Sequence, residues 1–248
     1  NHSDPTLCSD TGLGRLSSLV ILAATIDRVD RLRGIEGYWS SQASTFDEEP
    51  DHGLTDPDVR LAWAARLGEW IPPEAIRVAD LGCGTGSLSV LLAEAGLDVI
   101  GVDASPAMLE RARAKAQTLG VTVEFALGDA ADPDLADGSF DVVLSRHVVW
   151  TLADPIAALV RWARLLTQDG RLVLVEGRWF DPSRGSAGGI GMPWDGGVSA
   201  EDLMTALHPL FERIDHHPLS DDTALWGKTV TGERYAVVAT DPTTTQAT

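Results

Sequence analysis

The sequence has 248 residues, of which 44% are hydrophobic and 23% are charged. This length and composition suit one α/β domain with extra segments, or at most two small domains. Acidic residues outnumber basic residues by 37 to 19, which gives a net charge of -18. A nucleic-acid binder neutralises phosphates with Lys and Arg, so this balance disfavours nucleic-acid substrates and anionic membrane surfaces.

The cysteine count and the hydropathy pattern bear on the compartment. Two cysteines, Cys8 and Cys83, are too few for a disulfide framework or a zinc site. No apolar run approaches the roughly 20 residues of a membrane span, and the polar first ten residues do not resemble a secretory signal. We therefore expect a cytoplasmic monomer or homodimer, and the excess of Arg over Lys suggests a high-GC bacterial genome.

The periodicity of apolar residues divides the chain into an N-terminal helical segment and lid (1–70), a core (71–240) and a tail (241–248). Residues 1–12 are expected to be disordered, and apolar residues at helical spacing predict an amphipathic helix over 13–33. Gly34 and Gly37 are expected to break that helix. A short helix over 38–46, a loop over 47–58 and a helix over 58–70 are predicted to follow.

From residue 77 onward, short apolar runs alternate with helical stretches. The predicted strands are 77–81, 98–103, 123–127, 141–145 and 171–176, and the predicted helices between them are 88–95, 106–119 and 155–166. Such alternation indicates βαβ units and an open, doubly wound, mostly parallel sheet. The remaining predicted elements are a loop over 180–198, a helix over 199–207, and strands over 211–217 and 235–240.

The first predicted strand leads into a glycine-rich loop, in the run VADLGCGTG at residues 78–86. Ligands of doubly wound sheets bind at the carboxyl ends of the strands, where Gly82, Gly84 and Gly86 allow a close approach to the backbone. The third glycine comes one residue earlier than in the dinucleotide fingerprint. Asp80, just before the loop, suits an ammonium group and repels a pyrophosphate. The loop therefore favours S-adenosylmethionine over NAD.

Two more acids follow predicted strands. Asp103 ends the second strand, where a carboxylate can accept hydrogen bonds from both ribose hydroxyls. Asp129 follows the third strand and can accept from an adenine amino group, while the N–H of Ala130 donates to the ring. The alternative for the Gly-Asp pair at 128–129 is an ordinary turn.

These motifs resemble the class I S-adenosylmethionine-dependent methyltransferases, in the small-molecule group similar to ubiquinone/menaquinone methyltransferases. The matching stretches, within residues 77–176, are VADLGCGTG, VIGVDASPAMLERAR, FALGDAADPDLADGSFDVV and LLTQDGRLVLVE. The resemblance implies a Rossmann-like, mostly parallel seven-stranded sheet with N-terminal helices. It also implies S-adenosyl-L-methionine as the methyl donor and S-adenosyl-L-homocysteine as the product, and it leaves the methyl acceptor open.

The resemblance further implies roles for single residues. Asp80 and the glycine loop would hold the methionine part, Asp103 and Ala104 the ribose, Met108 the adenine face, and Asp129 and Ala130 the adenine edge. Arg146 would contact the methionine part through its backbone, and an upstream aromatic residue would close over the cofactor. The expected cofactor-binding residues are Tyr38, Trp39, Phe46, Asp80, Gly82, Gly84, Gly86, Asp103, Ala104, Met108, Asp129, Ala130 and Arg146.

The acceptor end is expected after the fourth strand, in the run SRHVVW at 145–150. His147 is a candidate general base for a hydroxyl or an amine, and a structural histidine at a strand end is the alternative. Methyl transfer often needs only positioning and desolvation of the acceptor, so a base is not required. Trp150, Trp179 and Trp194 are candidates for an apolar acceptor pocket, with plain packing as the alternative.

An acidic cluster, Asp47-Glu48-Glu49 with Asp51-His52, lies in the predicted lid. Four interpretations are open: a cation site, a site for a basic substrate, a solvated loop face, or part of a lid. His216-His217 has no Cys partner and no third histidine, so no metal site is predicted.

Taken together, the motifs predict a methyltransferase that acts on a small molecule at O, N or C by in-line displacement. One alternative is a cofactor-binding partner without catalytic activity. Another is an NAD(P)-dependent oxidoreductase, against which the early Gly86 and Asp80 argue. DNA amino-methylating enzymes carry an Asn-Pro-Pro-Tyr type motif after the fourth strand, and SRHVVW does not match it.

Overall fold

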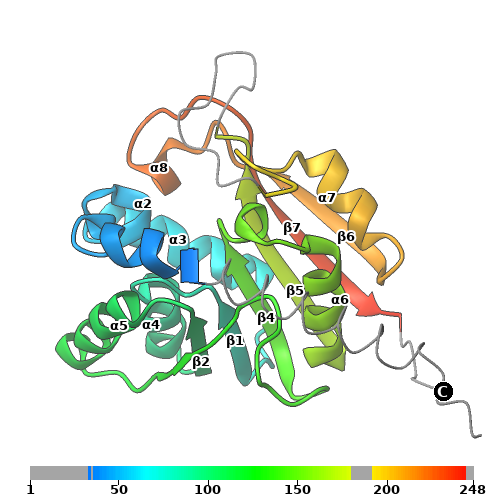
Figure 1. The fold of residues 1–248 in the computed structure, drawn as a ribbon, viewed down its shortest axis with the longest axis horizontal. Helices are drawn as coiled ribbons and strands as arrows, with labels where there is room; N and C mark the ends of the chain where they lie inside the picture. The colour runs from blue at the N-terminus through cyan, green and yellow to red at the C-terminus, as the bar shows by residue number, and fades with distance from the viewer. Residues whose placement is uncertain (1–32, 35, 180–191, 244–248) are drawn as a thin grey trace, which may run out of the picture.

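The computed structural model describes residues 33–34, 36–179 and 192–243, which form one open sheet with helices on both faces (Figure 1). The predictions for residues 1–32 and 180–191 lie outside the described residues. The strand order is β3-β2-β1-β4-β5-β7-β6, and β7 runs opposite to the other six strands. The strands are β1 (Arg77–Leu81), β2 (Asp98–Asp103), β3 (Glu124–Leu127), β4 (Phe140–Arg146), β5 (Leu166–Gly177), β6 (Phe211–Pro218) and β7 (Arg234–Pro242). The predicted mostly parallel seven-stranded sheet is confirmed.

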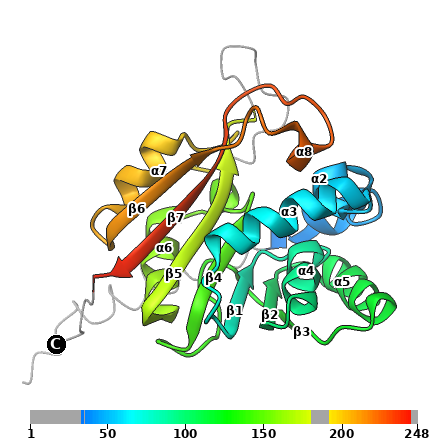
Figure 2. The same ribbon diagram turned by 180° about the vertical axis from the view of Figure 1, so that it is seen from behind.

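The helices lie in two layers, one on each face of the sheet (Figures 1 and 2). The elements α3 (Pro57–Trp70), α4 (Ser87–Glu94) and α5 (Pro106–Leu119) lie on one side, and α6 (Pro155–Leu165) and α7 (Ala200–Leu207) on the other. Alternation along β5 shows why both faces are covered. Leu172 and Leu174 belong to the apolar cluster under α6 and α7, whereas Val173 and Val175 belong to the cluster under α3 and α4. A strand buried on both faces reads as a continuous apolar run.

The helix starts are encoded locally. Asp56, Ser105 and Asp154 each accept a hydrogen bond from a backbone N–H of the first turn, and each is followed by proline. Proline suits the first helical position because its fixed φ is helical and it lacks an N–H that would stay unpaired there. Ser199 caps α7 by accepting a hydrogen bond from the Asp202 N–H.

The segment before α3 differs from its prediction. Gly34 is helical and Gly37 lies within a helical run over 36–42, so the predicted break at these glycines is wrong. The predicted loop over 47–58 contains the 3-10 helix η1 (Phe46–Glu48) and the short helix α2 (Pro50–Gly53). A Cβ on Gly53 would lie 2.3 Å from the Asp47 carbonyl oxygen, so α2 packs directly on η1 only because residue 53 is glycine. Tertiary packing thus overrides the loop propensity here.

The connection after β6 also contains an element that the sequence did not predict, the short helix α8 (Thr223–Trp226). Its Trp226 ring contacts the Trp63 ring of α3 at a centroid distance of 5.7 Å, and the Trp63 indole N–H donates to the Leu225 carbonyl oxygen. Together α2, α3 and α8 lie near the carboxyl ends of the central strands (Figure 2). Among the described residues, no helix is long and apolar enough to cross a membrane.

Candidate active site

A pocket opens at the carboxyl ends of β1, β2 and β4, beside the segment that carries η1 and α2. Its wall combines the glycine loop, the ends of three strands and residues 39–52. The lining residues are Trp39, Phe46, His52, Asp80, Gly82, Cys83, Gly84, Leu88, Asp103, Ala104, Met108, Asp129, Ala130, Arg146, His147, Val148, Trp150, Thr151, Leu152 and Trp179. Most of the predicted cofactor residues are therefore neighbours in space.

The glycine loop has the backbone conformation that requires glycine. Gly82 and Gly84 have φ values of 72° and 55°, in the left-handed region that side chains disfavour. A Cβ on Gly82 would lie 2.3 Å from a methyl group of Val148, so the loop also passes close to the chain after β4. The N–H groups of Gly82 and Cys83 donate to the Val102 carbonyl oxygen, at 2.8 and 3.1 Å. These contacts hold the loop over the end of β2.

Asp80 lies at the base of the pocket and is 3% exposed. Its Oδ2 accepts a hydrogen bond of 2.5 Å from the Ser89 hydroxyl. Burial raises the pKa of Asp80 to about 6, although the Ser89 hydrogen bond and the Arg146 guanidinium act in the opposite direction. A bound ammonium group would favour the ionised carboxylate.

Asp103 joins the end of β2 to the glycine loop. Its Oδ2 accepts from the Gly84 N–H and its Oδ1 from the Ser105 N–H, both at 2.8 Å. Burial raises the pKa of Asp103 against these hydrogen bonds. Each carboxylate oxygen has two lone pairs, so these bonds leave acceptor capacity for ribose hydroxyls.

The predicted adenine-binding residues lie on the wall formed after β3 and at the start of α5. The Asp129 Oδ1 accepts from the Ala131 N–H at 2.9 Å, which shapes the turn after β3. The Ala130 carbonyl oxygen accepts from the Trp162 indole N–H at 2.7 Å and is thereby attached to α6. Met108 is buried and lines the same pocket.

Aromatic residues form the side of the pocket opposite the sheet. The Trp39 ring meets the Phe46 ring at 6.1 Å and the Trp150 ring at 6.4 Å, in both cases edge to face. Phe46 stacks on the His52 imidazole at 4.4 Å. Trp39 and Phe46 of the N-terminal segment therefore line the pocket, and their predicted closure over a cofactor stays a prediction.

Arg146 ends β4 with its side chain buried beneath α2. Its guanidinium donates to the Asp51 carbonyl oxygen and lies over the Trp63 ring, 4.9 Å from the centroid. Burial lowers its pKa, and the nearby Asp51 and Asp80 carboxylates oppose that shift. This side chain attaches α2 to the sheet, while the predicted backbone contact with the cofactor stays a prediction.

His147 follows Arg146 in an unusual conformation. Its φ is 62°, its N–H donates to the Val175 carbonyl oxygen, and its carbonyl oxygen accepts from the Trp150 indole N–H. A left-handed conformation is uncommon for a residue other than glycine and directs this side chain into the pocket wall. Burial lowers the pKa of the imidazole well below its usual value, with Arg146 acting in the same direction.

Glu176 supports the segment after β4 from the end of β5. Its side chain is fully buried, and its Oε1 accepts from the N–H groups of Val148 and Val149 at 2.9 and 2.8 Å. Burial raises the pKa of Glu176 to about 8. Sequence spacing carried no signal for this support, because the partner groups are backbone N–H groups 27 and 28 residues away.

The comparisons with known proteins agree with this arrangement. Residues 79–174 match the model of the methyltransferase domain. The matched residues make up less than half of the chain. The chain is 40% identical over 103 residues to a ubiquinone biosynthesis O-methyltransferase of Cereibacter sphaeroides, covering 42% of each chain. It is also 45% identical over 133 residues to an uncharacterized methyltransferase of Mycobacterium tuberculosis, covering 48% of this chain and 53% of that protein. The chain thus spans about half the length of these curated relatives.

Solved structures share the fold of the methyltransferase domain at low sequence identity. The [4+2]-cyclase SpnF has a TM-score of 0.60 and 21% identity, over 73% of this chain and 80% of that chain. A geranyl diphosphate C-methyltransferase from Streptomyces coelicolor, in complex with Mg²⁺, geranyl diphosphate and S-adenosyl-L-homocysteine, has a TM-score of 0.57 and 18% identity. That match covers 73% and 79% of the two chains. These likenesses concern the fold.

Three of the predicted site residues do not line the pocket of the methyltransferase domain. Tyr38 is 46% exposed and packs its ring against Trp39, on the outside of the aromatic wall. Gly86 begins α4, where a Cβ would lie 2.8 Å from the Ala112 Cβ, so its role is in packing. Trp194 is half-buried and packs against the apolar cluster under α7. The structure thus places these three residues outside the pocket lining, and their predicted ligand contacts stay predictions.

The acidic cluster before α3 is not a uniformly solvated face. Asp47 pairs with Lys115 of α5 at 3.1 Å and accepts from the Thr85 hydroxyl at 2.5 Å. Glu49 pairs with Lys228, and both side chains are exposed. Asp51 and His52 of the same cluster lie close to His147, the residue that follows β4.

Proposed function

We propose that this protein is an S-adenosylmethionine-dependent methyltransferase that acts on a small molecule. One observation carries the proposal: Asp80, Asp103 and Asp129, from three successive strand ends, line the same pocket as the glycine loop. This order of carboxylates suits, in turn, the ammonium, the ribose hydroxyls and the adenine amino group of one cofactor molecule. A dinucleotide would bring its pyrophosphate to Asp80, where two like charges would repel.

The proposed reaction is an in-line displacement at the sulfonium methyl group. A lone pair of the acceptor forms a bond to the methyl carbon, the carbon–sulfur bond breaks, and its electron pair stays on sulfur in S-adenosyl-L-homocysteine. The protein's part is to align the acceptor and exclude water. His147, Trp150 and Trp179 form the wall on the acceptor side of the glycine loop in this proposal.

The relatives support a small-molecule acceptor. They include ubiquinone biosynthesis O-methyltransferases and a demethylmenaquinone methyltransferase of Thermus thermophilus, and the pocket wall is aromatic where the acceptor would enter. A second candidate is suggested by the [4+2]-cyclase neighbour: the same fold serves a different reaction in that protein. On that alternative, this chain binds the cofactor and transfers no methyl group.

Calorimetric titration with S-adenosyl-L-homocysteine tests the cofactor assignment. We expect one site per chain, and at least about tenfold weaker binding for Asp103→Asn, about 1.4 kcal/mol. The matched control is Asp98→Asn on the same strand, whose side chain is 69% exposed and which should bind like the unchanged protein.

Two outcomes contradict the proposal. Binding of NADH without any response to S-adenosyl-L-homocysteine would assign the pocket to a dinucleotide. Normal cofactor binding with no S-adenosyl-L-homocysteine formed from S-adenosylmethionine, across a panel of phenols, quinols, amines and carbon acids, would favour the second candidate.

A further inference from the structure

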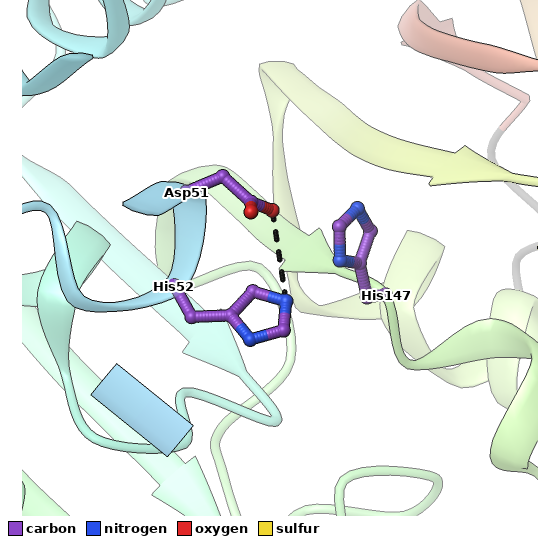
Figure 3. A group of neighbouring side chains, drawn as sticks. All are labelled: Asp51, His52 and His147. Carbon is purple, nitrogen blue, oxygen red and sulfur yellow. Dashed lines mark ion pairs between the residues drawn. The ribbon is translucent and has the colours of Figure 1, made fainter. Parts of the chain in front are cut away.

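Two histidines and one aspartate meet at the acceptor side of the pocket, and the proposed methyl transfer does not use them. Asp51 and His52 belong to α2, and His147 follows β4, 95 residues further along the chain. One ligand atom of each lies within 4.8 Å of the other two, and the His52 Nε2 is 3.6 Å from the Asp51 Oδ2. Figure 3 shows the three side chains pointing toward a common space.

We propose that Asp51, His52 and His147 bind one divalent transition-metal ion, with the remaining coordination positions open toward the pocket. Two imidazoles with one carboxylate suit Zn²⁺, Fe²⁺ or Co²⁺, whereas Mg²⁺ and Ca²⁺ prefer oxygen ligands. Three protein ligands with an open position are typical of catalytic metal sites, and structural zinc sites have four.

Packing inside the fold, and not exposure on the surface, holds the side chains of Asp51, His52 and His147 in place. Asp51 is 6% exposed, and His52 is held flat against Phe46 with ring planes 15° apart. The Nε2 atom of His147 is buried and has no hydrogen-bond partner within the described part of the chain. Buried polar side chains normally have a partner, so a fully buried imidazole nitrogen without one indicates a missing ligand.

Charges around the cluster are compatible with a cation. Asp51 supplies one negative charge to the site itself, and Asp47 and Asp80 lie close enough to act on Arg146. Arg146 and Arg234 are opposing positive charges. The Arg146 guanidinium donates to the main-chain oxygen of Asp51 and leaves the carboxylate available. Ligand atoms of a tetrahedral zinc site lie about 3.3 Å apart, so no pair of the three ligand atoms needs to close by more than about 1.5 Å.

The role of the ion rests on the proposed function. The ion would bind a hydroxyl group of the acceptor at its open position, which narrows the proposed reaction to O-methylation. Coordination lowers the pKa of the bound hydroxyl, whose proton passes to solvent. The oxygen lone pair then forms the bond to the methyl carbon as the carbon–sulfur bond breaks.

Titration of the metal-free protein with Co²⁺ tests the site directly. Co²⁺ reports its own coordination by visible absorption, so no acceptor or turnover is needed. We expect one Co²⁺ per chain, and at least about a hundredfold weaker binding for His52→Gln and for His147→Gln, because loss of a direct ligand should cost at least as much as the loss of an outer-shell partner. The control is the double variant His216→Ala/His217→Ala on β6, which should bind Co²⁺ like the unchanged protein.

The same samples are titrated with S-adenosyl-L-homocysteine, so the two proposals fail separately. Thermal unfolding of the His52→Gln and His147→Gln variants, compared with that of the unchanged protein, shows that both variants fold. The metal site is overturned if the unchanged protein binds no Co²⁺, if the His52 and His147 variants bind it equally well, or if the double variant alone abolishes binding. Co²⁺ binding without any cofactor binding would instead overturn the proposed function and leave the metal site in place.

Discussion

At the scale of single residues, the pocket is set by carboxylates whose surroundings differ. Asp103 accepts hydrogen bonds from the backbone N–H groups of Gly84 and Ser105, while Asp80 accepts one from the Ser89 hydroxyl and is more deeply buried. Desolvation disfavours the charged form of a carboxyl group, and hydrogen bonds to the charged form favour it. Asp80 is therefore the pocket carboxylate whose charge state is most sensitive to pH near neutrality.

The pKa of Asp80, raised to about 6, predicts how cofactor binding depends on pH. The ammonium group binds the ionised carboxylate, so protons compete with the cofactor. Affinity for S-adenosyl-L-homocysteine should be constant above about pH 7 and fall by up to about tenfold for each pH unit below about 6. Calorimetry from pH 5 to pH 8 measures this.

Two variants separate this effect from general acid instability. Asp80→Asn should bind weakly at every pH, with no transition near pH 6. Ser89→Ala removes the hydrogen bond that favours the ionised carboxylate, so its transition should move to higher pH. A transition unchanged in Ser89→Ala, or an affinity that does not depend on pH in the unchanged protein, would show that Asp80 does not hold the ammonium group.

At the scale of elements, the decisive feature is how η1 and α2 are attached to the core. The chain has two lysines, Lys115 and Lys228, and each pairs with an acid of the segment 46–49. Lys115 is 15% exposed in its side chain and also donates to the Ser87 hydroxyl at 2.6 Å. Lys228 and Glu49 are about half exposed. Exposed ion pairs contribute little, and partly buried pairs with added hydrogen bonds contribute more.

This difference in burial predicts that substitutions of Lys115 and Lys228 have unequal effects on cofactor binding. Lys115→Met should weaken binding of S-adenosyl-L-homocysteine by about tenfold, because it releases the segment that carries Phe46 and leaves Asp47 without its cation. Lys228→Met should change it less than about threefold. Calorimetry on both variants, with thermal unfolding as a check of folding, measures the difference. Equal effects of the two substitutions would mean that attachment of η1 to α5 does not control the pocket.

At the scale of the whole molecule, the sheet order and the net charge limit what the protein can act on. The strand order β3-β2-β1-β4 brings Asp80, Asp103 and Asp129 to one edge of the sheet, although they are far apart in the sequence. The net charge of -18 adds a field that repels polyanions. Both features favour a small ligand that carries a positive charge.

The charge predicts that the protein does not bind nucleic acids. Fluorescence anisotropy with labelled tRNA and duplex DNA, at 50 and 200 mM salt, should show no binding tighter than about 100 μM. Binding that weakens steeply between the two salt concentrations would reveal a local basic surface and would contradict the assignment of a small-molecule acceptor.

The sequence by itself determined the core elements, the doubly wound sheet and the three pocket acids. These are local features: β and helical periodicity, proline-capped helix starts, and glycines whose positive φ no other residue adopts easily. Right-handed crossovers between parallel strands then allow few sheet orders, so local elements led to the correct topology. The boundaries of β5 and β7 were predicted too short, because their ends are paired by partners distant in sequence.

Only the tertiary structure decided which residues beyond the loop reach the pocket. It placed Tyr38 outside the aromatic wall and Trp194 under α7, and it brought Asp51 and His52 to His147. Sequence spacing relates residues within a few turns of a helix or along one strand, and it carries no information about side chains that meet from elements 95 residues apart. Arg146 attaches α2 to the end of β4, and Gly53 allows α2 to pack on η1, so these contacts bring the three side chains together.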